Sequence, residues 1–242
     1  MTLLPSDRAP GLHVAPDVVV PDDAAIAPHV TIYSGVQLGA GVSLEQGAIL
    51  GRPQQIDARS RSRPIPAAGH TWIGDGCRVG SGTVVVAGAR VGRGSYLGDL
   101  VLLREDAIVG EEVMIGRGTS IAHNTRVGDR TRIQNLTLIG PWTYIEEDVL
   151  VAPRVTFIGD PTMGRRAADS VSPGIRVRRA SRIGTSAIIS QGVEVGAEAV
   201  VGAGSLVRDD VAPHTVVVGV PARHLRDVSA GELLEEWRED SG

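Results

Sequence analysis

A six-residue repeat runs through most of this chain and limits what the chain can fold into. Every sixth residue is a branched aliphatic one in three separate runs, and Pro213 is the single exception. The fifth residue of every block is Ala, Val, Ser, Thr or Cys. The first positions are Val14, Val20, Ile26, Ile32, Leu38 and Leu44, then Ile73, Val79, Val85, Val91, Leu97, Leu103, Val109, Ile115, Ile121, Val127, Ile133, Ile139, Ile145 and Val151, then Ile183, Ile189, Val195, Val201, Val207 and Pro213.

A period of six fits neither an α-helix nor a lone amphipathic strand. It predicts one short strand and one turn per block, with three blocks closing one triangular coil of a parallel β-helix. The 26 blocks correspond to between eight and nine such coils. Only 3% of the residues are aromatic, which agrees with a narrow interior that has no room for large rings. The sequence therefore predicts an all-β fold.

The repeat also divides the chain into parts. The predicted parts are an N-terminal lead-in over 1–13, a β-helix domain over 14–223 with inserted loops at 52–72 and 158–182, and a C-terminal helical segment over 224–242. In the last part, Ser229 and Glu232 have the spacing of a capping box, which marks the start of a helix. We expect this short helix to cover the end of the solenoid or a neighbouring subunit, because an open terminal coil exposes unpaired strand edges.

The two inserted loops are rich in arginine. Insertions in a regular scaffold often carry its function, although arginines in loops are also commonly plain solvated surface. The first loop holds Arg52, Gln54, Gln55, Arg59, Arg61 and Arg63; the second holds Asp160, Met163, Gly164, Arg165, Arg166, Arg176, Arg178, Arg179 and Arg182.

Charge and composition exclude several classes of function. The net charge is −4 and the pI about 5.9, so neither nucleic acid nor a membrane surface is an expected partner. No apolar run is long enough to span a membrane and the N-terminus lacks a secretory apolar region, so we expect a cytoplasmic protein. The chain has no lysine, which excludes Schiff-base chemistry, and its one cysteine, Cys77, is expected in the core.

His123 is the residue on which the chemistry is most reasonably placed. It holds the third position of its block, which points outward, and Glu105 holds the same position three blocks earlier, on the coil below. Neighbouring strands are about 4.8 Å apart, so the two side chains are within reach of each other. A histidine oriented by a carboxylate is the usual construction of a general base. An ordinary solvated pair on a polar face is the alternative.

No metal site is predicted. The other histidines do not form the group of three that a zinc site on this scaffold requires. These histidines are His13, His29, His70, His214 and His224.

Several segments resemble the hexapeptide-repeat acyltransferases, which are left-handed parallel β-helices. The segments that carry the resemblance are the repeat, HNTRVGDRTRIQN around His123, the arginine-rich second loop and the closing GVPAR. Within that superfamily, ILGRPQQ, GDLVLLRED and the MGR of the second loop are most similar to the nucleotide-sugar N-acetyltransferases. These enzymes use acetyl-CoA to acetylate an amino group on a dideoxy sugar that is attached to a nucleoside diphosphate. Parallel crossovers are normally right-handed, so the left hand is expected from the resemblance alone.

The resemblance also implies an assembly and a set of site residues. It implies a homotrimer with active sites in the clefts between subunits, and acetyl-CoA lying along the C-terminal coils. His123 matches the catalytic base, with Glu105 beside it. The acceptor would contact Asp99, Arg104, Asn124, Asp160 and Arg165. The coenzyme A of the donor would contact Gly184, Ala203, Arg208, Gly219, Pro221 and Arg223.

Two other functions stay open. One is O-acetylation of a sugar or natural-product hydroxyl, which would use the same fold, donor and base. The other is a non-catalytic solenoid that serves as a scaffold. Regular outer faces would favour the scaffold, whereas the outer positions here are irregular and both insertions carry clustered arginines.

Overall fold

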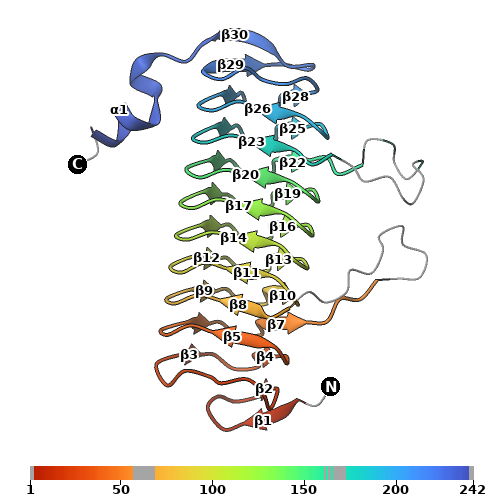
Figure 1. The fold of residues 1–242 in the computed structure, drawn as a ribbon, viewed down its shortest axis with the longest axis vertical. Coiled ribbons are helices and arrows are strands. Elements are labelled where there is room, and N and C mark those ends of the chain that lie inside the picture. The colour runs from red at the N-terminus through yellow and green to blue at the C-terminus, as the bar shows by residue number, and fades with distance from the viewer. Residues whose placement is uncertain (1–2, 57–68, 161, 163–164, 166–172, 240–242) are drawn as a thin grey trace.

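The protein is a left-handed parallel β-helix of about ten turns, which confirms the predicted fold class. The computed structural model describes residues 3–56, 69–160, 162, 165 and 173–239. Three sheets form the sides of a triangular prism, and the C-terminal helix projects from it (Figure 1). There are more turns than the predicted eight to nine because strands outside the three runs of blocks, such as those ending at Phe157 and Val177, continue the coils.

Each sheet is built from every third strand of the chain. Sheet A contains, in order, β1 (Leu4–Ser6), β2 (Leu12–Val14), β4 (Thr31–Ile32), β7 (Ile49–Arg52), β10 (Val84–Val86), β13 (Leu102–Leu103), β16 (Ser120–Ile121), β19 (Leu138–Ile139), β22 (Thr156–Phe157), β25 (Ile188–Ile189) and β28 (Leu206–Val207). Sheet C contains β5 (Val36–Leu38), β8 (Thr71–Ile73), β11 (Arg90–Val91), β14 (Ile108–Val109), β17 (Arg126–Val127), β20 (Tyr144–Ile145), β23 (Arg176–Val177) and β26 (Glu194–Val195).

Sheet B completes the prism. It contains β3 (Ala25–Ile26), β6 (Ser43–Leu44), β9 (Arg78–Val79), β12 (Tyr96–Leu97), β15 (Met114–Ile115), β18 (Arg132–Ile133), β21 (Leu150–Val151), β24 (Arg182–Ile183), β27 (Val200–Val201), β29 (Thr215–Val218) and β30 (Arg223–Asp227). The chain passes from sheet A to sheet C, then to sheet B and back to sheet A. We name the three edges of the prism by these passages: the A–C, C–B and B–A corners.

The inward positions of the repeat form the core, as the periodicity predicts. From Leu44 to Val207 the first residues of the blocks are almost fully buried. Small fifth residues fill the corners, and several of their buried hydroxyls donate to main-chain carbonyls: Thr83 to Gly98 at 2.6 Å and Thr125 to Gly140 at 3.2 Å. Cys77 is also buried, its thiol lies 3.0 Å from the carbonyl oxygen of Gly92, and burial raises the pKa of that thiol.

The corners share one turn geometry, which explains their tight stacking. The fourth residue of most blocks has a positive φ near 60°, as at Asp106, Asn124 and Trp142. Glycine serves the same position elsewhere, for example Gly118 with a φ of 67°. Because this turn recurs in every coil, residues that are three blocks apart in sequence lie one above the other.

Antiparallel strands close both ends of the solenoid. At the N-terminal end β1 pairs with β2, so part of the predicted lead-in joins the sheet. At the C-terminal end β30 pairs with β29 and covers the edge that the helix was expected to cover. The short helix does form: the turn η1 (Ala230–Glu232) leads into α1 (Leu234–Glu239), and the Glu232 carboxylate accepts hydrogen bonds from the Ser229 N–H and hydroxyl. The segment packs against the C–B corner, where Glu198 accepts a hydrogen bond from the Leu234 N–H.

The second insertion is shorter than the sequence predicted. The coil resumes at β23, so Arg176, Arg178, Arg179 and Arg182 belong to the solenoid and not to the loop. Arg178 forms ion pairs with Glu146 and Glu194 at 2.9 and 2.8 Å. The physical reason is that the frame restarts with Ile175 and Val177, two inward aliphatic residues that the run of blocks beginning at Ile183 left out. Four of the six predicted loop arginines therefore have structural positions.

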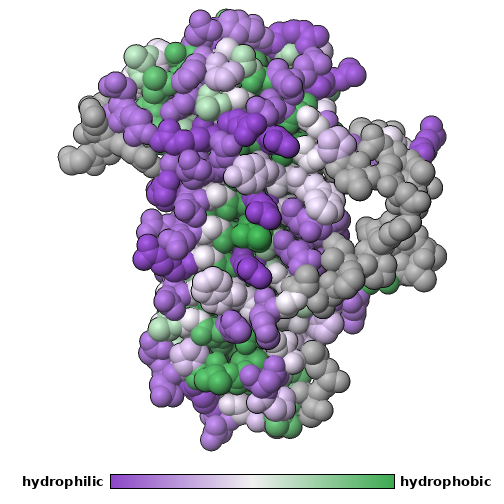
Figure 2. All heavy atoms as spheres, in the orientation of Figure 1, coloured by the Kyte–Doolittle hydropathy of each residue, from purple (hydrophilic) through white to green (hydrophobic). Residues whose placement is uncertain are grey.

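The outer surface is mixed. Figure 2 shows hydrophilic atoms over most of the face toward the viewer, with hydrophobic patches in its middle and lower parts. Among the described residues, no helix has the length and apolar character to cross a membrane.

Candidate active site

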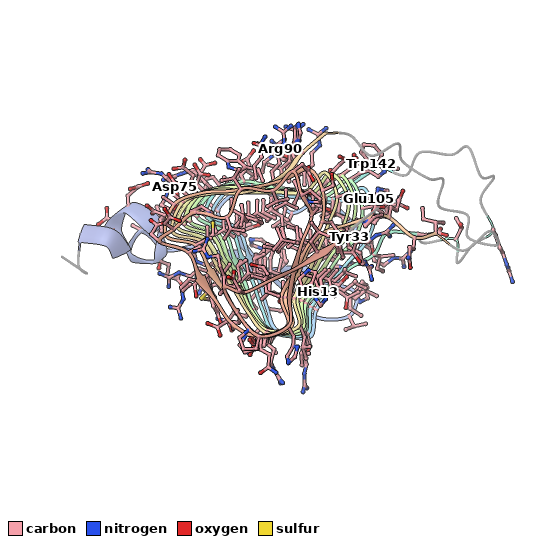
Figure 3. The ribbon with its side chains drawn as sticks, turned by 90° about the horizontal axis from the view of Figure 1, so that it is seen from below. His13, Tyr33, Asp75, Arg90, Glu105 and Trp142 are labelled. Atoms are coloured by element: carbon pink, nitrogen blue, oxygen red, sulfur yellow. The ribbon has the colours of Figure 1, made fainter. Side chains whose placement is uncertain are left out.

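The A–C corner gathers the chemistry-bearing residues of the chain. The order of strands in sheet A determines what stacks there: the first loop leaves after β7, Glu105 follows β13, His123 follows β16, Trp142 follows β19, and the second loop leaves after β22. Seen along the prism, Glu105 and Trp142 lie at the same corner (Figure 3). The predicted histidine thus stands between the roots of both insertions.

His123 is half-buried and held by two neighbours. Its Nδ1 atom lies 2.9 Å from the amide nitrogen of Asn124. Its ring meets the indole of Trp142 edge to face, with ring centroids 5.9 Å apart and planes at 89°. Burial, followed by the positive charge of Arg104, lowers the pKa of His123 below its ordinary value, whereas Glu105 and Asp106 partly oppose this shift. The imidazole is therefore held in its neutral form at pH 7.

Glu105 makes its hydrogen bonds to residues other than His123. Only 4% of its surface is exposed. Within the described part of the chain, its carboxylate accepts hydrogen bonds from Gln54 at 2.6 Å and from the Arg104 guanidinium at 2.5 and 3.1 Å. Glu105 thus ties the root of the first loop to the coil below His123. It acts on the imidazole through its charge and through its effect on Arg104.

Asp106 adds a second acidic group beneath the imidazole. Burial, and then repulsion from the Glu105 carboxylate, raises the pKa of Asp106, while Arg90 and, when it is protonated, His123 oppose the change. The site therefore places an arginine and two acidic side chains around one imidazole. Such mixed charge around a titratable group is a common feature of catalytic sites.

Asn124 controls which nitrogen of His123 carries the proton. With the amide N–H directed at Nδ1, that nitrogen accepts, so the proton of the neutral ring is on Nε2. A flip of the amide, which exchanges its oxygen and nitrogen, presents Oδ1 instead; Oδ1 then accepts from Nδ1–H and leaves Nε2 free to take a proton. The sequence predicted only that Asn124 contacts the substrate that accepts the acetyl group. In the structure Asn124 also contacts the proposed catalytic base, His123.

Asp99 lies at a different corner. It follows β12 and stands at the B–A corner, where its carboxylate accepts a hydrogen bond from the N–H of Ser81 at 2.9 Å. Asp129 and Asn135 accept the same kind of bond from the coil below. Asp99 is thus one of a series of side chains that join neighbouring coils, and one subunit does not bring it to His123.

Two predicted acceptor contacts lie in the second loop. The Asp160 carboxylate accepts hydrogen bonds from the N–H and hydroxyl of Thr162 at 2.8 and 2.6 Å, and Arg165 is exposed. The other loop residues singled out in the sequence, Arg59, Arg61, Arg63, Met163, Gly164 and Arg166, lie outside the described residues.

The residues predicted to contact coenzyme A lie in three places. Gly184 and Ala203 stack at the B–A corner; a Cβ on Gly184 would lie 2.5 Å from the main-chain nitrogen of Ala203. Arg208 and Arg223 line a cavity of about 290 Å³ beside the last coil. The remaining members, Gly219 and Pro221, belong to the turn between β29 and β30, which hydrogen-bonds to β28 through Gly219.

Arg208 is at the same corner of the prism as His123, whereas Arg223 begins β30 in sheet B. Arg208 follows β28, which is four strands above β16 in sheet A. At about 4.8 Å per strand the separation along the corner is roughly 19 Å. An extended pantetheine arm is of this order of length.

Trp142 is a site residue that sequence reasoning missed. A signal for it exists: it follows Asn124 by three blocks and holds the same position in its block, so it stacks directly above Asn124. Its main-chain N–H donates to the carbonyl oxygen of His123 at 3.3 Å.

Comparison with known proteins identifies the repeat. The family model described as the hexapeptide repeat of succinyl-transferase matches residues 71–98 and 180–208. The chain is a hexapeptide-repeat protein. A curated 2,3,4,5-tetrahydropyridine-2,6-dicarboxylate N-acetyltransferase from Limosilactobacillus fermentum is 69% identical over 26 residues. That match spans 11% of the hexapeptide-repeat protein and 11% of the relative.

Solved structures share its fold. The UDP-N-acetylglucosamine acyltransferase from Campylobacter jejuni is 17% identical, with a TM-score of 0.56, over 89% of this chain and 73% of that one. A hexapeptide-repeat acetyltransferase from Vibrio cholerae O1 biovar eltor, solved with acetyl coenzyme A, is 31% identical over 49% of this chain and 69% of that one, with a TM-score of 0.43. The first comparison shows a common β-helix architecture.

Proposed function

We propose that this hexapeptide-repeat protein is an acetyl-CoA-dependent N-acetyltransferase that acts on an amino group of a nucleotide-linked dideoxy amino sugar. The observation that carries the proposal is the placement of a neutral, half-buried imidazole at the A–C corner, between the roots of both insertions. The fold is shared with a UDP-N-acetylglucosamine acyltransferase, which supports acyl transfer to a nucleotide sugar.

In the proposed reaction the neutral amine attacks the thioester carbonyl of acetyl-CoA. His123 takes the proton that the nitrogen sheds on attack, through Nε2 once the Asn124 oxygen faces Nδ1. Main-chain N–H groups of an adjacent coil stabilise the negative oxygen of the intermediate. The intermediate then collapses, the C–S bond breaks, and the thiolate takes the proton from His123. The products are an acetamido sugar and free coenzyme A.

The acyl donor is proposed to lie along the A–C corner toward the last coils. Arg208 and Arg223 would meet its phosphates, because guanidinium groups pair well with phosphate oxygens. Both arginines are exposed, and Arg223 is 3.9 Å from the Asp209 carboxylate, so it is available for a stronger partner. The diphosphate of the acceptor would be held by the second loop, where Arg165 lies.

Sheet A supports the proposed homotrimer. From β4 to β28 the outward residue just before each inward first position of this sheet carries no charge, whereas arginines occur repeatedly at this position on sheets B and C. We call these residues of sheet A the uncharged row; Arg52, at the end of β7, lies outside it. The row consists of Thr31, Ile49, Val84, Leu102, Ser120, Leu138, Thr156, Ile188 and Leu206. Leu138 is 48% and Ile188 39% exposed in the single chain. A row of this kind suits contact with a second copy, and it borders the corner that holds His123, so the site would lie in a cleft between subunits.

A screen of acceptors tests the proposal. Purified protein is mixed with acetyl-CoA and nucleotide-linked sugars that carry either an amine or a hydroxyl at the same carbon, and the release of free thiol is followed. We expect thiol release with an amino sugar and a product that is heavier by one acetyl group. Release with only the hydroxyl analogues would show O-acetylation instead. Failure of acetyl-CoA and of CoA to raise the melting temperature would favour a scaffold.

A further inference from the structure

Trp142 exposes a large ring directly beside the proposed base. It is 47% exposed. The chain has few aromatic residues, and Trp142 is one of only three tryptophans. The core does not explain it, because the interior of the prism is filled by the aliphatic first positions. Its backbone does not explain it either, because the turn with a φ of 60° suits Asn or Asp, and those residues occupy the same position in the two coils below.

The backbone that carries the ring is also firmly positioned. From below, the main-chain N–H of Trp142 donates a hydrogen bond to the His123 carbonyl oxygen. From above, the chain returning from the second loop packs on its backbone so closely that a Cβ on Gly174 would collide with the Trp142 carbonyl oxygen. Tyr144 then donates its N–H to the Ile175 carbonyl oxygen at 2.8 Å. The backbone of Trp142 is thus held from both sides and its indole meets the imidazole of His123 edge to face, so the half-exposed ring is a ready platform for a ligand.

The geometry indicates which part of an acceptor would meet the indole. The indole and imidazole centroids are 5.9 Å apart with perpendicular rings, and His123 must lie within about 3 Å of the reacting nitrogen. The group next to that nitrogen therefore reaches the indole, and in a nucleotide sugar that group is the sugar ring. The nucleobase of the sugar nucleotide lies farther away, beyond the diphosphate.

We propose that Trp142 packs against the sugar ring that bears the reacting amine and favours a deoxygenated face over a hydroxylated one. This inference rests on the proposed function. The face of an indole is electron-rich, so it attracts the C–H edges of a sugar ring. A hydroxyl directed at the indole would lose its bonds to water without gaining a partner, which disfavours sugars that carry one.

The test compares Trp142→Ala and Trp142→Phe with the parent protein, using Trp72→Phe as the control because Trp72 is an equally exposed tryptophan on sheet C. We expect Trp142→Ala to raise KM for a dideoxy amino sugar nucleotide about tenfold, with kcat and the KM for acetyl-CoA nearly unchanged. Trp142→Phe should retain most of the affinity. The preference for the dideoxy sugar over its fully hydroxylated analogue should fall in Trp142→Ala alone.

Binding gives a second readout that does not depend on turnover. Tryptophan fluorescence of the parent and of Trp72→Phe should change on addition of the sugar nucleotide, and Trp142→Phe should lose that change. An unchanged KM and preference in Trp142→Ala would overturn the inference while leaving the proposed function intact. A change in oligomeric state without a change in KM would also overturn it, by showing that the ring is covered by a second copy. Absence of acetylation by the parent protein would instead refute the proposed function.

Discussion

Replacing His123 with alanine should lower kcat by at least about 100-fold, because a positioned general base contributes roughly 10² to 10⁴ in rate. His123 is the imidazole that lies at the A–C corner with a lowered pKa, in contact with both Asn124 and Trp142. The measurement is the steady-state rate of thiol release with saturating acceptor. The matched control is His29→Ala, which removes an exposed histidine at the B–A corner.

The pH profile shows whether the loss is that of a base. Burial and Arg104 lower the pKa of His123 below 6.5, so the imidazole stays neutral, and competent to accept a proton, at pH values below 6.5. The acceptor amine titrates at higher pH and contributes one acid limb to kcat/KM in every variant. In the parent protein a second limb should appear below pH 6.5, and His123→Ala should lack it. Near-normal turnover in His123→Ala, or an identical profile, would remove His123 as the base.

Replacing Phe157 with alanine should lower the free energy of unfolding by about 3–5 kcal/mol, as expected for a large aromatic side chain removed from a packed core. Phe157 is the only phenylalanine of the chain and is fully buried at the end of β22, where the second loop leaves. In a solenoid each coil contacts only its neighbours, so the cavity cannot be filled from a distant part of the core. Urea denaturation at fixed protein concentration gives the change.

Phe157→Leu is the control for this prediction. Leucine fills most of the same volume, so the expected loss is below about 1.5 kcal/mol. A loss under about 1 kcal/mol in Phe157→Ala would show that this coil collapses around the gap, contrary to the packing described.

The repeat determines much of the fold and part of the site. Inward positions such as Ile121 and Thr125 follow from a period of six, since each coil repeats the same turn and buries the same positions. Stacking at intervals of three blocks follows as well, and it correctly places Glu105 on the coil below His123. The same rule would have placed Trp142 above Asn124, had it been applied upward.

Other features depend on contacts that no period encodes. Gln54, in the first insertion, is 51 residues away from Glu105 in the sequence. Its side chain donates a hydrogen bond to the Glu105 carboxylate, which does not hydrogen-bond to the His123 imidazole. Asp99 holds the same block position as Glu105, but its role depends on which of three corners it occupies. The coil resumes at Ile175 after the second loop. The six-residue period does not predict this point, because an insertion between two blocks can have any length.

The most direct measurement of the central claim is a structure of the protein with bound coenzyme A. We expect the coenzyme along the A–C corner, with its sulfur beside the imidazole of His123 and its phosphates toward Arg208 and Arg223. Coenzyme A bound at the C–B or B–A corner, remote from His123 of its own or a neighbouring subunit, would contradict it.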